Sequence, residues 1–205
     1  MRGVFPVLSN LGVANGITTL GAVFGFLGIL SASNGDLRVA GTFLFGAILC
    51  DRLDGPVAHW LGEKSHFGGH LDSLSDGLSL CLLPAYLGYR MGLESAGAVT
   101  ILSMYVLAGL WRLADFNLAG IVVEDGRPFF RGIPTTVAAS WLLVVLAAVI
   151  HVSGPLARAS LLTVYAAGAF LMSSRILYPK EGVATKILYV AVPLATVLLW
   201  LPLST

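Results

Sequence analysis

Residues 51–76 read DRLDGPVAHWLGEKSHFGGHLDSLSD, and the four aspartates in this stretch are the most informative feature of the sequence. Asp51 and Asp54 are spaced i, i+3 and Asp72 and Asp76 are spaced i, i+4, so each pair lies on one face of its own helix. A short polar turn, GEKS at residues 62–65, separates the two pairs. The stretch therefore predicts two antiparallel neighbouring helices whose four carboxylates converge on one point.

Four converging carboxylates need compensating positive charge, because like charges this close cannot all stay ionised. Arg52 and Lys64 are near in the sequence, but two cations are too few. Hard oxygen ligands without cysteine or clustered histidine favour Mg²⁺ or Mn²⁺ over Zn²⁺. We therefore expect a divalent-metal site, and two ions shared by four aspartates would resemble the two-metal arrangement found at phosphate centres.

Small residues stand among these acids, at Gly55, Ala58 and Gly68. They would let a nucleotide approach the helix backbones closely. The alternative is that they let helices pack closely, as small residues often do in membranes. A single aspartate at a helix end can also be a cap, but caps explain four aspartates in this spacing poorly.

The composition around this stretch is that of an integral membrane protein. Of the 205 residues, 57% are hydrophobic and only 11% are charged, whereas soluble domains carry about 25% charged residues. The net charge of +1 comes with no basic stripe, which argues against a nucleic-acid partner. Cys50 and Cys81 both lie in apolar runs and are expected to be buried thiols.

Apolar runs long enough to span a bilayer recur along the whole chain. We predict an all-α, polytopic protein of about seven transmembrane helices, separated by turn-forming sequences. No long polar segment interrupts the chain, so residues 1–205 are expected to form one membrane-embedded domain. The predicted spans are residues 10–32, 37–61, 69–91, 96–118, 133–152, 155–177 and 184–203.

The basic residues predict how these spans are oriented, because cytoplasmic connections carry an excess of Lys and Arg. One side of the predicted topology holds only Arg38, Arg90 and Arg158. The other side holds nine basic residues: Arg2, Arg52, Lys64, Arg112, Arg127, Arg131, Arg175, Lys180 and Lys186. We therefore expect the N-terminus and the aspartates to face the cytoplasm from the inner membrane, with the C-terminus outside.

The stretch 51–76 resembles the signature of the CDP-alcohol phosphotransferases, D-x2-D-G-x2-A-R-x8-G-x3-D-x3-D. Every spacing of the signature is kept, and His59 stands where the family has arginine. Three further stretches are similar to elements of bacterial phosphatidylserine synthases: RLADFN at 112–117, RGIPTT at 131–136 and LMSSRILYPK at 171–180. In the first of these, Asp115 replaces an arginine of the family.

The resemblance implies the CDP-alcohol phosphotransferase fold, a homodimer and a role for each site residue. Asp72 and Asp76 would be the catalytic residues, with Asp76 as the general base that deprotonates the acceptor hydroxyl. Two Mg²⁺ or Mn²⁺ ions would bridge the diphosphate of CDP-diacylglycerol, held by Asp51, Asp54, Asp72 and Asp76. The nucleotide would be contacted by Asp54, Gly55, Ala58, His59 and Gly68.

The acceptor implied by the resemblance is L-serine, giving phosphatidylserine and CMP in phospholipid biosynthesis. Arg112 and Arg131 suit the serine carboxylate, because arginine binds carboxylates through two parallel hydrogen bonds. Asp115 also lies in the expected acceptor region, and an added acid would equally suit a cationic amino alcohol. Glycerol phosphate and inositol remain alternative acceptors.

Two readings outside catalysis also remain open. One is a member of the family that keeps the fold without the activity. The other is a membrane transporter that uses intramembrane acids. A transporter predicts repeated halves or paired broken helices, and the sequence has neither.

Overall fold

The computed structural model describes residues 11–124, 126–152, 154–179 and 182–202, and it is predominantly helical. Helices occupy each of the seven intervals that the sequence predicted. They are α1 (Val13–Ser33), α2 (Leu37–Leu61), α3 (His66–Asp76), the π-helix η2 (Gly77–Leu82), α4 (Leu83–Arg90), α5 (Ala96–Ala119), α6 (Thr135–Val149), α7 (Pro155–Met172) and α8 (Val183–Trp200).

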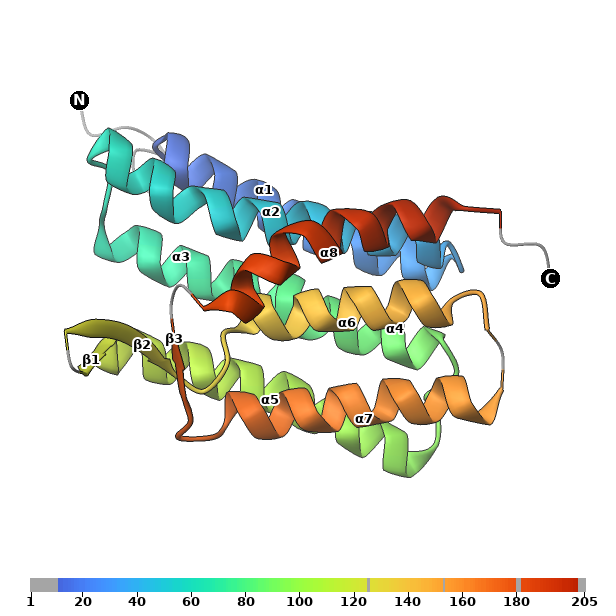
Figure 1. The fold of residues 1–205 in the computed structure, drawn as a ribbon. Helices are drawn as coiled ribbons and strands as arrows, with labels where there is room; N and C mark the ends of the chain where they lie inside the picture. Colours follow the sequence, from blue (N-terminus) through green and yellow to red (C-terminus); the bar gives the residue numbers. More distant parts are fainter. Residues whose placement is uncertain (1–10, 125, 153, 180–181, 203–205) are drawn as a thin grey trace.

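The helices lie side by side in an elongated bundle, and the chain runs back and forth along its length (Figure 1). The α2–α3, α5–α6 and α7–α8 connections therefore gather at one end of the bundle. These connections lie on the side of the predicted topology that holds the nine basic residues. Arg2 and Lys180, two of these nine, lie outside the described residues.

Three helices of the described chain, α1, α5 and α7, are long and apolar enough to cross a membrane. α6 and residues 185–200 of α8 are apolar but shorter. At 1.5 Å per residue α6 reaches only about 22 Å, against about 30 Å for the hydrocarbon core. Asp51, Arg52 and Asp54 interrupt the apolar run of α2. The helices fit a membrane protein, but the count of seven spans is not confirmed.

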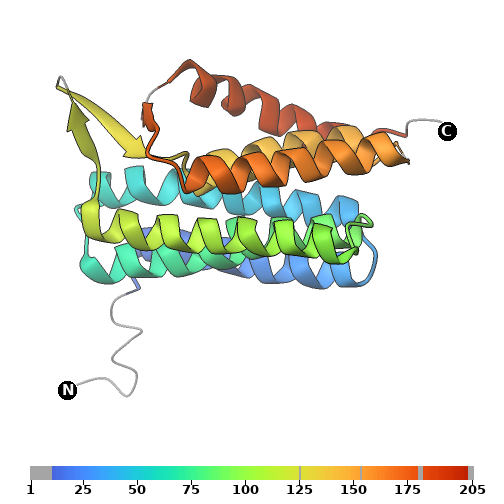
Figure 2. The same cartoon turned by 90° about the horizontal axis from the view of Figure 1, so that it is seen from below.

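The structure also contains a small sheet that the sequence did not predict, at the end of the bundle where the α2–α3, α5–α6 and α7–α8 connections gather. Strands β1 (Val122–Glu124), β2 (Arg127–Arg131) and β3 (Leu177–Pro179) pair antiparallel in the order β1-β2-β3. Figure 2 shows the β1–β2 hairpin projecting beyond the helices where α5 ends. The strands are too short for a clear alternating pattern, and β3 is far from β2 in sequence, so the all-α prediction omitted them.

α3, η2 and α4 follow one another without a break and run from the aspartates into the core, and η2 is the π-helical part of this segment. Pro84 has no N–H to donate to the carbonyl four residues earlier, that of Leu80. The buried Tyr105 hydroxyl of α5 donates to that carbonyl instead, at 3.1 Å. Tyr165 of α7 donates in the same way to the carbonyl of Pro84. Tyr105 thus bonds to a carbonyl of the π-helical segment, and the two tyrosines attach η2 and α4 to α5 and α7.

Close packing of α1 brings this helix against both acidic helices. A side-chain carbon at Gly25 would lie only 2.8 Å from Cβ of Ser79, so only glycine fits there. Gly21 similarly faces Cys50 and Ser75. Small residues that allow backbones to approach are a common packing device between membrane helices. Because α1 packs this closely, its Thr18 lies near the aspartates of α2 and α3.

Candidate metal centre and adjoining pocket

The turn between α2 and α3 sets the two aspartate pairs against each other. Gly62 ends α2 in the left-handed conformation at φ 68°, which favours glycine. Ser65 then caps α3, because its hydroxyl accepts a hydrogen bond from the Gly68 amide at 3.0 Å. The chain therefore reverses within a few residues and returns as the antiparallel neighbour that the sequence predicted.

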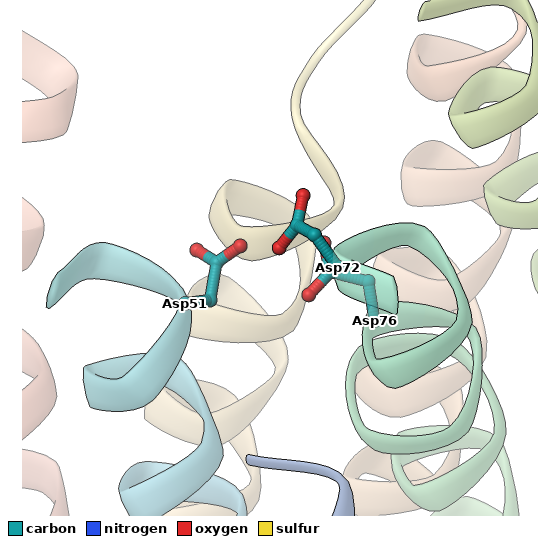
Figure 3. A group of neighbouring side chains, drawn as sticks. All are labelled: Asp51, Asp72 and Asp76. Atoms are coloured by element: carbon teal, nitrogen blue, oxygen red, sulfur yellow. The ribbon is translucent and has the colours of Figure 1, made fainter. Parts of the chain in front are cut away.

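Three of the four aspartates come together between α2 and α3. One carboxylate oxygen from each of Asp51, Asp72 and Asp76 lies within 4.8 Å of the other two. Figure 3 shows Asp51 reaching from one helix toward Asp72 and Asp76 on the other. Asp76 is only 4% exposed, so its charge is largely removed from solvent.

Asp54 is buried beside this cluster but is not one of its three members. Its Oδ2 accepts a 2.6 Å hydrogen bond from the hydroxyl of Thr18 on α1. Asp54 still interacts electrostatically with Asp51 and Asp72. The geometry thus separates a tight group of three carboxylates from a fourth that is held by α1.

The residues of the cluster suit a hard divalent cation. Arg52 and Arg112 act electrostatically on Asp51, so two positive charges face the four negative charges of the aspartates. That deficit is costly in a partly buried place, and a divalent ion would remove it. The donors are all carboxylate oxygens, the type that Mg²⁺ and Mn²⁺ prefer. The acidic cluster is therefore able to bind a metal ion.

Arg112 of α5 connects the acids to a neighbouring pocket. Its guanidinium carbon lies 5.3 Å from the ring centre of Phe116 and 5.6 Å from that of Phe130. The side chain is 9% exposed, and its Nε has no hydrogen-bond partner among the described residues. A buried, unsatisfied donor is expensive, so this arginine is poorly explained as an anchor at the membrane surface.

The pocket next to Arg112 has a volume of about 380 Å³ and contains charges of both signs. It brings together Arg112, Asp115 and Arg131, the three residues predicted to bind the acceptor. Arg175 was not predicted and also lines it, within the stretch 171–180 that resembles the synthase element. The remaining lining residues are Trp111, Met172, Ser173 and Ser174.

The residues predicted to contact the nucleotide lie along the same end of α2 and α3. Gly55 faces open space, with no atom within 4 Å of where a side-chain carbon would stand. Gly68 instead packs close to the Asn15 side chain, so its small size also serves the contact with α1. Ala58 and His59 lie in the last turns of α2, and His59 is exposed.

Comparison with known proteins identifies relatives of this chain. A protein of Saccharomyces cerevisiae named CDP-diacylglycerol–serine O-phosphatidyltransferase is 36% identical over 148 residues, 65% of this chain and 54% of that protein. The archaetidylserine synthase of Methanothermobacter thermautotrophicus is 32% identical over 177 residues, 85% of this chain and 72% of its own length.

A third relative, the CDP-diacylglycerol–serine O-phosphatidyltransferase of Methanocaldococcus jannaschii, is 33% identical over 129 residues. That match covers 63% of this chain and 60% of the relative. The chain thus spans between about half and three quarters of the length of these three proteins.

The family comparison covers every described helix. The model of the CDP-alcohol phosphatidyltransferase family matches residues 11–202, which include the four aspartates and the pocket residues. This confirms the resemblance drawn from the spacing of the aspartates. The chain belongs to the CDP-alcohol phosphatidyltransferase family.

Proposed function

We propose that this protein transfers a phosphatidyl group from CDP-diacylglycerol to the hydroxyl of L-serine, forming phosphatidylserine and CMP. The observation that carries the proposal is the convergence of Asp51, Asp72 and Asp76 beside a pocket that contains arginines and an aspartate. The relatives named as serine phosphatidyltransferases support the same reaction.

The four aspartates are proposed to hold two divalent cations, Mg²⁺ or Mn²⁺. Asp51, Asp72 and Asp76 would supply the tight group of ligands, and Asp54 would complete the second position. Bound ions neutralise charge on the diphosphate and on the departing phosphate. Gly55, Ala58, His59 and Gly68 would line the path of the CDP group, and the open space at Gly55 supports that placement.

Asp76 is the proposed general base, assisted by Asp72. The hydroxyl of Thr135 donates a hydrogen bond to Oδ2 of Asp76 and so orients the carboxylate that would take the proton of the serine hydroxyl. The serine oxygen then bonds to the β-phosphorus of CDP-diacylglycerol, and the bond from that phosphorus to the bridging oxygen breaks. CMP leaves with the bridging oxygen, and the proton passes from Asp76 to solvent.

The charges of the pocket match a zwitterionic acceptor. Serine carries one carboxylate and one ammonium beside its hydroxyl, and the pocket contains both arginines and Asp115. We propose that Arg112 and Arg131 bind the carboxylate, with Arg175 close by, and that Asp115 binds the ammonium. On this reading the aspartate that departs from the family pattern contributes to amino-acid recognition.

The decisive test of the reaction is an acceptor panel with the purified protein in detergent. CDP-diacylglycerol and Mg²⁺ or Mn²⁺ would be supplied with serine, glycerol 3-phosphate, inositol, ethanolamine or choline. We expect CMP release and phosphatidylserine formation with serine, and little turnover with the others. Faster turnover with another alcohol would keep the transferase class and remove the serine assignment, whereas no turnover with any acceptor would overturn both.

We further propose that the chain is a single domain of seven spans in the inner membrane, with the acidic end of the bundle facing the cytoplasm. A reporter fused after Thr205 should then read as external, and one inserted at residues 124–127 as cytoplasmic. A cytoplasmic reading after Thr205 would mean an even number of spans.

The resemblance also implies a homodimer, and a monomeric mass in detergent and in lipid nanodiscs would contradict it.

A further inference from the structure

Hydroxyl groups from two other helices hold the carboxylates of the site. The donors are all buried threonines, and each donates to the Oδ2 atom of its aspartate. The oxygen–oxygen distances are 2.6 Å for Thr18–Asp54, 3.0 Å for Thr135–Asp76 and 2.6 Å for Thr136–Asp51. α1 and α6 therefore both reach into the acidic centre of α2 and α3.

The two threonines of α6 differ from most other helical threonines in this chain. A threonine inside a helix usually donates to the carbonyl four residues earlier. Among the described residues six do so: Thr18, Thr19, Thr42, Thr100, Thr163 and Thr196. Thr135 and Thr136 open α6, where the helix has no earlier turn to supply such a carbonyl. Their hydroxyls are free to reach the aspartates of neighbouring helices.

The chain before α6 is fixed in a way that holds both hydroxyls in place. Gly132 has a φ of 65°, and a side-chain carbon there would collide with the backbone at Met172. Its amide donates to the carbonyl of Ile176, and the amide of Ile133 donates to that of Leu171. The start of α6 is thus attached to the end of α7 on the side of the acceptor pocket.

We propose that Thr135 and Thr136 are positioning residues for the metal centre. Thr135 would hold Asp76, and Thr136 would hold Asp51, in the orientation in which each carboxylate could bind the cation. Partners of this kind orient metal ligands in many proteins, and their loss typically weakens metal binding by about 10- to 100-fold. The inference rests on the divalent-metal site proposed above, but not on the identity of the acceptor.

The test is Mn²⁺ binding by the purified protein, followed through the electron paramagnetic resonance signal of free Mn²⁺ in the absence of substrates. Thr135→Val and Thr136→Val keep the shape and remove the donor, so each should weaken Mn²⁺ binding by about 10- to 100-fold. Thr135→Ser and Thr136→Ser keep the hydroxyl, so their Kd for Mn²⁺ should stay within about threefold of that of the unsubstituted protein.

Thr100→Val is the matched control, because the Thr100 hydroxyl bonds within α5, to the carbonyl of Ala96, and to no aspartate among the described residues. It should leave Mn²⁺ binding unchanged. If a valine variant cannot be purified, Thr135→Ala and Thr136→Ala remove the same hydroxyls with less bulk and carry the test.

Unchanged Mn²⁺ affinity in the valine or alanine variants would overturn the positioning role and leave the metal site standing. Equal weakening in the serine variants would also overturn it, because the hydroxyl would then not be what matters. Failure of the unsubstituted protein to bind Mn²⁺ would overturn the metal centre itself, together with this inference.

Discussion

Replacing Asp72 with asparagine is expected to lower phosphatidyl transfer by about 10³-fold or more. Asp72 is one of the three carboxylates whose oxygens lie within 4.8 Å of one another, and the amide removes a charge that holds the cation. Metal ions stabilise charge at phosphate centres by several kcal/mol, and about 1.4 kcal/mol corresponds to a tenfold rate change. The measurement is CMP release from CDP-diacylglycerol at saturating Mg²⁺ or Mn²⁺.

The same variant should separate the loss of metal from the loss of fold. Removing one of several like charges relieves repulsion, so metal-free Asp72→Asn should unfold at the same temperature as the unsubstituted protein or higher. A cation at 100 times its Kd stabilises the native state by about 2.7 kcal/mol. Asp72→Asn should lose most of that stabilisation, which thermal unfolding with and without Mn²⁺ would measure.

Asp36→Asn serves as the control for Asp72→Asn. Asp36 precedes α2 in the connection from α1, at the end of the bundle opposite the acidic cluster. The same chemical change at that position should leave both transfer and the Mn²⁺-induced stabilisation unaltered. An unreduced rate of phosphatidyl transfer in Asp72→Asn, or in the unsubstituted protein with excess chelator, would contradict the divalent-metal proposal.

Removing Arg112 is expected to raise the KM for serine by about 10- to 150-fold. Arg112 is buried beside the rings of Phe116 and Phe130, its Nε has no hydrogen-bond partner among the described residues, and it lines the proposed acceptor pocket. A hydrogen bond between charged groups contributes about 1.5–3 kcal/mol, which corresponds to that range. Arg112→Ala should change the KM for CDP-diacylglycerol much less. Arg131 is exposed, so Arg131→Ala should have a smaller effect on serine.

Two analogues of serine distinguish recognition of its carboxylate from recognition of its ammonium. Ethanolamine lacks the carboxylate, and 3-hydroxypropionate lacks the ammonium. Arg112→Ala should impair kcat/KM for serine and 3-hydroxypropionate and spare the weak use of ethanolamine. Asp115→Asn should impair serine and ethanolamine and spare 3-hydroxypropionate.

Arg90→Ala is the control for the pocket variants, because Arg90 ends α4 near the opposite end of the bundle. It should leave all three acceptors unaffected. An equal loss with all three acceptors in Arg112→Ala would show that Arg112 supports the acidic cluster and does not bind the acceptor carboxylate. If Asp115→Asn leaves the relative use of the three acceptors unchanged, Asp115 does not bind the ammonium of serine.

Much of the site could be predicted from the spacing of the aspartates, because that spacing is a local property of two helices. Residues three or four apart share a helix face whatever surrounds the helix. The short turn at residues 62–65 then left an antiparallel return as the expected geometry. The helix intervals were predictable for a similar reason, because apolar runs and turn-forming breaks alternate regularly along this chain.

The pocket was only partly predictable, because its residues come from segments far apart in sequence. Arg112 and Asp115 lie on α5, Arg131 ends β2, and Arg175 follows α7. The resemblance of separate stretches suggested the first three of these residues. Arg175 was not predicted, because its place in the pocket depends on the pairing of β3 with β2 and on the attachment of this segment to the start of α6. Pairing between short strands that are far apart in the sequence leaves no local pattern from which it could be predicted.

The sequence by itself determined the membrane class, the helix intervals and the two acidic faces, since each depends on composition or on helical periodicity. The tertiary structure alone decided that Asp51, Asp72 and Asp76 form the close group while Asp54 bonds to Thr18. It also decided that hydroxyls of α6 hold two of the aspartates. Those outcomes depend on how closely α1 and α6 pack against the acidic helices, and packing distances are set by side chains that meet only in the folded bundle.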